Sequence, residues 1–425
     1  MPTSAASRPE FRVRYLVESA VPADQAAEVI AGEQSSGTFV ALPGETAALK
    51  ERSRARVVRV EALPPVSEPT LNSAWVARHG HTGVFHRAEI EIAFPIENVG
   101  VNLPTLLATV AGNLFELGEV TALRMLDLDL PEHYAAAFSG PAFGIEGTRQ
   151  LAGVHGRPLI GTIIKPSIGL SAAQTAELVD ALCAAGVDFI KDDELISDPP
   201  YERFEARLAA VMPVLHRHAE RLGRMPMYAI NITGSVNDLL RRHDAVVCAG
   251  GTCVMVSVNW VGFAAVEHLR RHAQVPIHAH RNGWGAFTRH PGLGFSFEAY
   301  QKLWRLAGVD HVHVNGIRSK FWEADESVIR SARACLAPFA GVQPVMPVFA
   351  SGQWAGQAPE LYSALRSTDL MHLAGGGIIG HPDGIKAGVQ SMRDAWEAAV
   401  AGVDLSEYAR TRPALQRALV HFGAH

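Results

Sequence analysis

The chain has 425 residues, of which 48% are hydrophobic and 19% are charged, so it is long enough to bury a sizeable core and to form more than one domain. A formal net charge of -5 lacks the basic balance of a nucleic-acid-binding protein, and we expect no nucleic-acid partner. The four cysteines form no CxxC pair, residues 1–10 read as a polar tail, and no apolar run is long enough to span a bilayer. We therefore expect a cytoplasmic protein without a membrane partner.

The amino-terminal region alternates strand and helix patterns over residues 11–145. Strand-like alternation or apolar enrichment occurs in four segments, Phe11–Val17, Ala55–Ala62, Arg87–Ile96 and Val120–Leu130. Helical patterns cover Ala23–Gly32 and Asn102–Phe115. The order β-α-β-β-α-β predicts a ferredoxin-like α+β domain.

The rhythm changes after a Gly/Pro-rich stretch at residues 139–144. Eight short apolar runs now alternate with helix-length segments: Leu159–Ile164, Phe189–Ile190, Met227–Ile232, Cys253–Val258, Pro276–Ala279, His311–Val314, Val345–Phe349 and Leu370–Leu373. Apolar strands between helices are typical of a parallel sheet that is buried on both faces. Eight units over residues 146–425 predict a (β/α)8 TIM barrel, so the expected fold class is α/β with a ferredoxin-like domain in front. No GxGxxG motif follows the first strand of either region, which argues against a dinucleotide-binding fold.

Polar residues follow seven of these predicted strands. They are Lys165, Lys191–Glu194, Asn231, His278–Arg281, His311–His313, Ser351–Gly352 and Gly375–Gly377. Each has an ordinary structural interpretation, because a lone histidine is usually a core residue and a charged run is usually a solvated turn. Barrel active sites are built at the carboxyl ends of the strands, and seven polar segments at that position favour an active site.

The run from Lys191 to Glu194 permits two interpretations. Strand alternation places Lys191 and Asp193 on one face, with Glu194 at the strand end. Two carboxylates beside a lysine form either a salt-bridge cluster or, if a lysine carbamate supplies a third anionic oxygen, a site for a hard cation. Composition alone does not choose between them.

Several motifs together resemble the RuBisCO superfamily, in family order and over almost the whole chain. They are Gly161–Leu170, Gly186–Glu194, His278–Arg281, Asp310–His313, Ala350–Gly352, Gly375–Pro382, Glu33–Phe39 and Gly112–Asn113. The resemblance implies a ferredoxin-like domain followed by a barrel. It also implies a homodimer whose active sites each join one barrel to the partner's amino-terminal domain.

The resemblance also implies the metal site and the catalytic groups. Lys191 would be carbamylated and would bind Mg2+ together with Asp193 and Glu194. Lys165 would be the acid/base of enolisation, and His280 would lie near the substrate hydroxyls. The cation would stabilise an enolate, and a lysine with a lowered pKa suits proton transfer.

Further positions resemble the substrate contacts of the family. Lys320 falls at the mobile-loop lysine that contacts the incoming carboxyl and pairs with Glu33. The implied contacts at the distal phosphate are Arg281 and His313, with Ser351 and Gly352. Those at the second phosphate are Thr38, Gly376 and Gly377. Asn113 would reach the substrate from the partner chain.

The chain also departs from the carboxylases of the family. Ser167 replaces the second lysine of Lys-Pro-Lys, Trp284 replaces a histidine, and Gln353 replaces a glycine. The loop Asn315–Trp322 lacks the usual glycine-rich run. Because these changes lie around the substrate and spare the metal positions, we expect a RuBisCO-like protein that does not fix carbon.

The chain retains Lys320 and Glu33. A β-keto acid places a carboxylate where a carboxylase holds its new carboxyl group, and the positive charge of Lys320 is useful there. The two retained residues therefore favour a β-keto acid substrate. We expect a Mg2+-dependent, enolate-forming enzyme for a phosphorylated 3-oxo sugar acid such as 3-oxo-isoapionate 4-phosphate, in apiose catabolism. It would act by decarboxylation or by carboxyl migration and hydrolysis. The alternative is an enolase or isomerase of a methylthio-sugar phosphate in methionine salvage. A non-catalytic paralogue would have lost the metal residues, which this chain keeps.

Overall fold

The computed structural model describes residues 8–37 and 43–423, which form two compact units. The sheet unit contains the described residues up to Phe138, together with Gly283–Leu306 and Phe339–Val342. The barrel unit contains Ser139–Asn282, Ala307–Pro338 and the described residues from Gln343 onward.

The sheet unit is built on a five-stranded sheet with the order β10-β4-β1-β3-β2. Its strands are β1 (Glu10–Ser19), β2 (Arg56–Val66), β3 (Phe85–Pro95), β4 (Val120–Asp129) and β10 (Leu293–Phe295). The central strand β1 pairs antiparallel with both β3 and β4. Alternate β1 side chains from Phe11 to Val17 are buried, as the sequence pattern predicted. The first four strands and the helices between them confirm the ferredoxin-like order.

The predicted helix over residues 102–115 is interrupted. Asn102 caps α4 (Leu103–Ala111) by accepting a hydrogen bond from the Thr105 amide, and a 3-10 turn, η2 (Asn113–Glu116), follows. A Cβ atom at Gly112 would lie 2.2 Å from the Ala108 carbonyl oxygen, so the chain approaches itself too closely for any side chain there. The other helices of this unit are α1 (Ala23–Glu33), α2 (Ala47–Ser53), α3 (Ala74–Arg78), η1 (Ile96–Asn98), α5 (Glu132–Ala135), α12 (Trp284–Thr288) and most of α13 (Phe297–Ala307).

Strand β10 comes from the segment after a barrel strand and was not predicted. It pairs parallel to β4 over three residues, too few for a recognisable alternation. In the same segment the Trp284 ring packs 4.2 Å from the Tyr300 ring, centroid to centroid, and also contacts Phe297. Trp284 is thus buried in an aromatic cluster of the sheet unit, a structural role that the sequence did not indicate.

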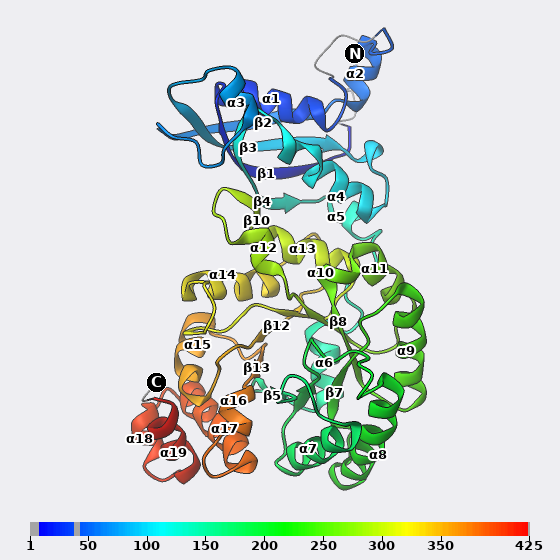
Figure 1. Ribbon diagram of the computed structural model, residues 1–425, viewed down its shortest axis with the longest axis vertical. Coiled ribbons are helices and arrows are strands. Elements are labelled where there is room, and N and C mark those ends of the chain that lie inside the picture. The colour runs from blue at the N-terminus through cyan, green and yellow to red at the C-terminus, as the bar shows by residue number, and fades with distance from the viewer. Residues whose placement is uncertain (1–7, 38–42, 424–425) are drawn as a thin grey trace, which may run out of the picture. The chain divides into compact units, whose positions relative to one another are not determined.

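The barrel unit contains a closed barrel of eight parallel strands with helices around it (Figure 1). In chain order the strands are β5 (Leu159–Ile163), β6 (Phe189–Lys191), β7 (Met227–Asn231), β8 (Cys253–Ser257), β9 (Ile277–His280), β11 (His311–His313), β12 (Met346–Phe349) and β13 (Met371–Leu373). All eight predicted strands are present, and pairing of β13 with β5 and of β11 with β9 completes the ring. The TIM barrel is confirmed.

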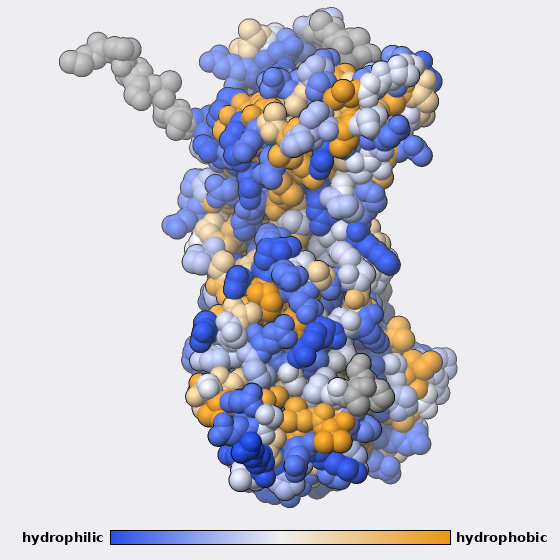
Figure 2. Space-filling model, turned by 90° about the vertical axis from the view of Figure 1, so that its left-hand side faces the viewer, coloured by the Kyte–Doolittle hydropathy of each residue, from blue (hydrophilic) through white to orange (hydrophobic). Residues whose placement is uncertain are grey.

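The helices of the barrel unit follow its strands as predicted, except α6, which precedes β5. The longer ones are α6 (Gly144–Ala152), α7 (Ala172–Ala184), α8 (Phe204–Leu222), α9 (Val236–Cys248), α11 (Phe263–His272), α14 (Asp325–Leu336), α15 (Ala358–Leu365), α17 (Ile385–Ala401) and α19 (Pro413–Phe422). Short turns of helix occur at α10 (Val258–Val261), η3 (Ala355–Gln357), α16 (Gly375–Ile379) and α18 (Leu405–Ala409). In the described part of the chain, no helix combines the length and hydrophobicity that a membrane crossing requires. On the face in view in Figure 2, hydrophobic patches lie among hydrophilic residues.

Asp310 joins three parts of the barrel unit. Its carboxylate is fully buried and accepts hydrogen bonds from the amides of Phe143, Gly144 and Ile277. It also forms an ion pair with Arg270, whose nitrogen lies 3.1 Å away. The carboxylate therefore ties the start of α6 to β9 and β11.

We predict that Asp310→Ala lowers the free energy of unfolding by about 3–5 kcal/mol, because it leaves the Arg270 charge buried without its partner. Asp383→Ala is the control, since Asp383 is half exposed and lies 3.9 Å from Arg417, and it should cost at most about 1 kcal/mol. Denaturant titration of both variants measures the difference. Equal losses would contradict the anchoring role of Asp310.

Candidate functional site

Five predicted site residues meet at the carboxyl ends of β5, β6 and β9. Lys191 Nζ lies 3.6 Å from Glu194 Oε2, and His280 Nε2 lies 3.3 Å from the same oxygen. Lys165 Nζ lies 2.7 Å from Asp193 Oδ2. The sequence placed these groups at equivalent strand ends, and the closed barrel brings them into one cluster.

Lys191 and Glu194 form a charge pair in which Lys191 is buried and Glu194 is partly exposed. Lys191 is 1% exposed, and burial lowers the pKa of its ammonium group despite the attraction of Glu194 and Asp193. Burial alone would raise the pKa of Glu194, but the attraction of His280 and Lys191 outweighs it and lowers that pKa to about 2. The site thus holds an ionised carboxylate beside a lysine whose neutral amine is more accessible than usual.

His280 has a defined tautomer. The Asn282 amide donates a hydrogen bond to Nδ1, so the ring proton resides on Nε2 and faces Glu194. Burial lowers the pKa of His280 to about 4, and the ring is neutral at pH 7. The Nε2–H group of His280 therefore lies beside the Glu194 carboxylate, 3.3 Å from Oε2.

Asp192 lies outside this cluster, although its neighbours in sequence belong to it. Its carboxylate accepts hydrogen bonds from Arg207 Nε at 3.0 Å, from the Asn231 amide at 2.8 Å and from the Tyr228 hydroxyl. Asp192 and Arg207 are both fully buried. Asp192 thus anchors the strand end that carries Lys191 and Asp193.

The residues at this strand end fit a magnesium ion. Asp193 and Glu194 supply carboxylate oxygens, the ligand type that hard cations prefer. Asn231 Nδ2 donates to the carbonyl oxygens of both residues at 3.4 and 3.3 Å and so restrains the segment that presents them. A carbamate on Lys191 would add a third anionic group, and the lowered pKa of Lys191 favours the amine form from which a carbamate is made.

Arg281 and His313 lie together on neighbouring strand ends, as predicted. Arg281 Nε donates to the His313 carbonyl oxygen, and Arg281 Nη2 lies 3.4 Å from Glu323 Oε2. Glu323 also accepts hydrogen bonds from Asn315 and Ser327. No sequence pattern pointed to Glu323, because its link to Arg281 depends on how the loop after β11 folds back. The charge of Arg281 is therefore partly balanced within the protein.

The loop after β12 has an unusual backbone. Ser351 and Gly352 have φ angles of 78° and 67°, in the left-handed region that residues with side chains seldom adopt. Gln353 is buried, and its Nε2 donates to the carbonyl oxygens of Ser351 and Ile317. Its side chain thus ties this loop to the loop after β11.

Neighbouring loops bring the remaining barrel residues close to this region. A Cβ atom at Gly375 would lie 3.7 Å from Lys165 Cε, and one at Gly352 would lie 3.7 Å from the Lys320 amide. Space is open beside Gly376, whereas a Cβ atom at Gly377 would lie 2.6 Å from the Gln353 carbonyl oxygen. The Lys320 side chain is exposed.

Three predicted contacts belong to the amino-terminal region. Glu33 is the last residue of α1, and Asn113 is the first residue of η2, both in the sheet unit. Thr38 lies outside the described residues. The roles of these three residues in an active site stay predictions.

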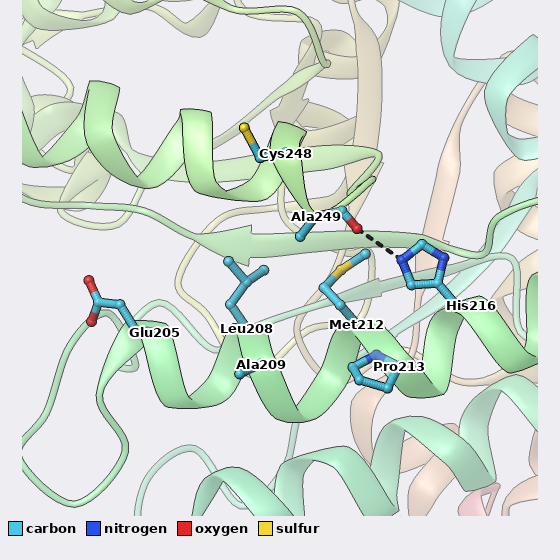
Figure 3. Close-up of a pocket in the computed structure, with 8 residues that line it drawn as sticks. All are labelled: Glu205, Leu208, Ala209, Met212, Pro213, His216, Cys248 and Ala249. Carbon is cyan, nitrogen blue, oxygen red and sulfur yellow. Dashed lines mark hydrogen bonds between the residues drawn. The ribbon is translucent and has the colours of Figure 1, made fainter.

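Two other features of the barrel unit were considered as sites. Figure 3 shows a cavity of about 440 Å³ between α8 and the end of α9, with a mostly apolar lining that includes Met212 and Cys248. Its His216 side chain is bonded to the Ala249 carbonyl oxygen, so the lining offers no assembled catalytic group. We call the group of Lys165, Lys191, Asp193, Glu194 and His280 the lysine–carboxylate cluster, and the lining of the cavity includes none of these residues.

The second feature is a cluster of His243, Asp244 and His272 with the spacing of a metal site. His243 Nε2 accepts a hydrogen bond from the Gln274 amide, so its proton resides on Nδ1 and is directed at Asp244. A metal ion would need the lone pair on that nitrogen. The cluster is therefore better explained as a hydrogen-bonded surface group.

Comparison with known proteins identifies the family. The sequence matches the family described as ribulose bisphosphate carboxylase large chain, catalytic domain, over residues 144–422. Residues 10–134 match the corresponding amino-terminal domain. The chain belongs to the RuBisCO large-chain family. Its fold and the lysine–carboxylate cluster at the barrel strand ends are in keeping with this membership.

Among its relatives, the chain has higher sequence identity to RuBisCO-like enzymes than to a ribulose bisphosphate carboxylase. The chain is 53% identical to a 3-oxo-isoapionate-4-phosphate transcarboxylase/hydrolase of Xanthobacter autotrophicus, over 95% of this chain and 97% of the relative. It is 44% identical to a 3-oxo-isoapionate-4-phosphate decarboxylase of Rhizobium etli, over 96% and 97% of the two chains. A crystal structure of a RuBisCO-like protein from Burkholderia fungorum superposes with a TM-score of 0.92 at 49% identity, covering 97% of this chain and all of that one. The chain is a RuBisCO-like enzyme whose named relatives are lyases and hydrolases.

We predict that Asp192→Asn and Asp193→Asn have different effects on stability, although the two residues are adjacent. Asp192→Asn should lower the free energy of unfolding by about 3 kcal/mol, because Arg207 stays buried without its counter-charge. Asp193→Asn should lower it by less than about 1 kcal/mol, because its partner Lys165 reaches solvent. Denaturant titration compares the variants, and a larger loss for Asp193→Asn would reject the anchoring role of Asp192.

Proposed function

We propose that the protein is a magnesium-dependent, enolate-forming enzyme that acts on a phosphorylated 3-oxo sugar acid. The observation that carries this proposal is the buried Lys191 beside Glu194, with Lys165 and Asp193 paired next to them. Magnesium bound to carbamylated Lys191, Asp193 and Glu194 would stabilise the negative charge of an enolate, typically by several kcal/mol.

The remaining chemistry is assigned to side chains of the barrel. Loss of carbon dioxide from a 3-oxo acid breaks the bond to the carboxyl carbon and leaves its electron pair in an enolate. Lys165 then delivers a proton to the enolate carbon; it is held for this by Asp193 and by the Ser167 hydroxyl, which accepts its hydrogen bond at 2.7 Å. Lys320 holds the carboxylate of the substrate. In the alternative route another carbon of the enolate attacks the released carbon dioxide, and the new carbon–carbon bond gives a different 3-oxo acid. Water then adds to its keto carbon and the bond from that carbon to the carboxyl-bearing carbon breaks; the electron pair of this bond takes up a proton, and two carboxylic acids result.

The substrate class rests on the relatives together with the retained lysine of the loop after β11. The two named relatives act on 3-oxo-isoapionate 4-phosphate, by transcarboxylation and hydrolysis or by decarboxylation. We assign the same substrate to this chain, in apiose catabolism in the cytoplasm. The higher identity to the transcarboxylase/hydrolase favours carboxyl migration with hydrolysis.

We further propose a homodimer with shared active sites, in which Glu33, Thr38 and Asn113 of one chain complete the site of the other. In this arrangement Glu33 pairs with Lys320, and Asn113 reaches the bound substrate. The support is membership of the RuBisCO large-chain family over both of its domains.

We predict that Lys191→Ala lowers magnesium-dependent turnover by at least about 100-fold, since the metal site loses its third anionic group. Isothermal calorimetry should record a matching loss of Mg2+ affinity. Lys386→Ala removes an exposed lysine of α17 and should leave both values unchanged. Full activity of Lys191→Ala with intact folding would remove the metal mechanism, and no activity in the unaltered protein with any phosphorylated sugar would favour a non-catalytic paralogue.

Carboxyl-labelled 3-oxo-isoapionate 4-phosphate tests the substrate and separates the two routes. We expect turnover, with the 13C label retained in a carboxylic acid product if the carboxyl group migrates and released as carbon dioxide if it is lost. Product NMR distinguishes these results. Turnover of a methylthio-diketone phosphate without turnover of the sugar acid would establish the methionine-salvage alternative instead.

A further inference from the structure

Asn259 follows β8, the barrel strand for which the sequence predicted no site residue, and lies in the short helix α10. Its side-chain nitrogen Nδ2 donates hydrogen bonds to two consecutive carbonyl oxygens, that of Arg281 at 3.2 Å and that of Asn282 at 3.0 Å. The register of the sheet explains this reach. Ser257 of β8 is aligned with His280, the last residue of β9, so Asn259 comes opposite the turn that follows β9 two residues further on. The side-chain amide carries two N–H bonds, so it can serve both carbonyl groups.

Asn231 makes the same kind of contact on the other side of the site. Its Nδ2 donates to the consecutive carbonyl oxygens of Asp193 at 3.4 Å and Glu194 at 3.3 Å. In the pairing of β7 with β6, Ala229 is aligned with Lys191, so Asn231 again lies two residues beyond the aligned pair. Each asparagine therefore restrains two peptide groups at a strand end that carries part of the lysine–carboxylate cluster.

The ends of β7 and β8, which lie between these two contacts, are joined to each other. The Thr233 amide donates to Asn231 Oδ1 at 3.0 Å, and the Thr233 hydroxyl accepts a hydrogen bond from the Ser257 amide at 2.9 Å. Asn231 is fully buried, and its own amide donates to Asp192. β7 and β8 supply no side chain to the lysine–carboxylate cluster, but their joined ends connect the two strands that do.

The contact made by Asn259 reaches His280 through a single peptide group. The carbonyl group of Arg281 and the N–H group of Asn282 belong to the same peptide, which is planar and rigid. Asn259 holds the carbonyl oxygen of this peptide, and its N–H donates to His280 Nδ1 at 3.3 Å. That hydrogen bond directs Nε2 of the ring toward Glu194. A rotation of this peptide would therefore break both hydrogen bonds and release the imidazole ring.

We infer that Asn259 is a positioning residue for His280, and that it is the counterpart of Asn231, which restrains Asp193 and Glu194. Together the two asparagines fix the separation between the two sides of the site, where His280 Nε2 lies 3.3 Å from Glu194 Oε2. Supporting groups of this kind hold reacting groups in place without contacting the substrate. The effect of Asn259 on turnover rests on the proposed function, whereas its effect on the turn after β9 does not.

Hydrogen–deuterium exchange of the full-length protein tests the two contacts separately. Asn259→Ala should speed exchange in residues 278–283 and leave residues 189–195 unchanged, and Asn231→Ala should speed exchange mainly in residues 189–195. Asn237→Ala is the control, because Asn237 is an exposed residue of α9, and it should alter neither segment.

An unchanged exchange rate in residues 278–283 of Asn259→Ala would overturn the inference, whether or not the protein turns over any substrate. Equal acceleration of both segments by Asn259→Ala would overturn it as well, since that result indicates a general loss of stability. Asn259 is only partly buried, so its variants carry the test even where Asn231→Ala fails to fold.

Asn259→Asp replaces the donor by a carboxylate of almost the same size, which faces two carbonyl oxygens at neutral pH. We expect kcat to fall by about 10- to 100-fold. KM should change little, because the Arg281 side chain is held separately by the His313 carbonyl oxygen and by Glu323. Protonation of the new carboxyl group restores one donor, so activity relative to the unaltered protein should rise as the pH falls.

Asn259→Ala removes the same donor without adding a titratable group. Its kcat should fall by a similar factor, and its activity relative to the unaltered protein should not depend on pH. Full turnover by both variants, or the same pH dependence in both, would contradict the positioning role.

Discussion

The candidate site depends on one charge pair, the buried Lys191 amine beside the partly exposed Glu194 carboxylate. A lysine that is 1% exposed carries a desolvation penalty, and nearby carboxylates offset it. The balance leaves the amine easier to deprotonate than a surface lysine. A group poised in this way can remain a salt-bridge partner or become an anionic ligand after reaction with carbon dioxide. The metal-site interpretation, which composition left undecided, stays a prediction, and the lowered pKa of Lys191 is in keeping with it.

Strand geometry gives two adjacent aspartates different tasks. Side chains alternate between the faces of a strand, so Asp192 meets Arg207 and Tyr228, whereas Asp193 meets Lys165. The contacts of Asp192 stabilise the end of β6, whereas the pair of Asp193 and Lys165 belongs to the candidate site. The precision of the site thus comes from an anchor that takes no part in the proposed chemistry.

Most barrel strands were predictable because they are short apolar runs between helix-length segments, and the site residues were predictable because they end or follow those strands. Contacts made by distant segments were not. Strand β10 is too short to show a pattern, and Glu323 reaches Arg281 only through loop folding. The hydrogen bond between the Thr148 hydroxyl and His311 Nε2 joins α6 to β11, although the two residues are 163 positions apart in the sequence.

The central claim is that Lys191 becomes a carbamate at a magnesium site. The most direct test is 13C NMR of the protein in 13C-bicarbonate with Mg2+, compared with Lys191→Ala under the same conditions. We expect a carbamate resonance that is present in the unaltered protein, strengthened by Mg2+ and absent from the variant. An active, magnesium-loaded protein without that resonance would contradict the account.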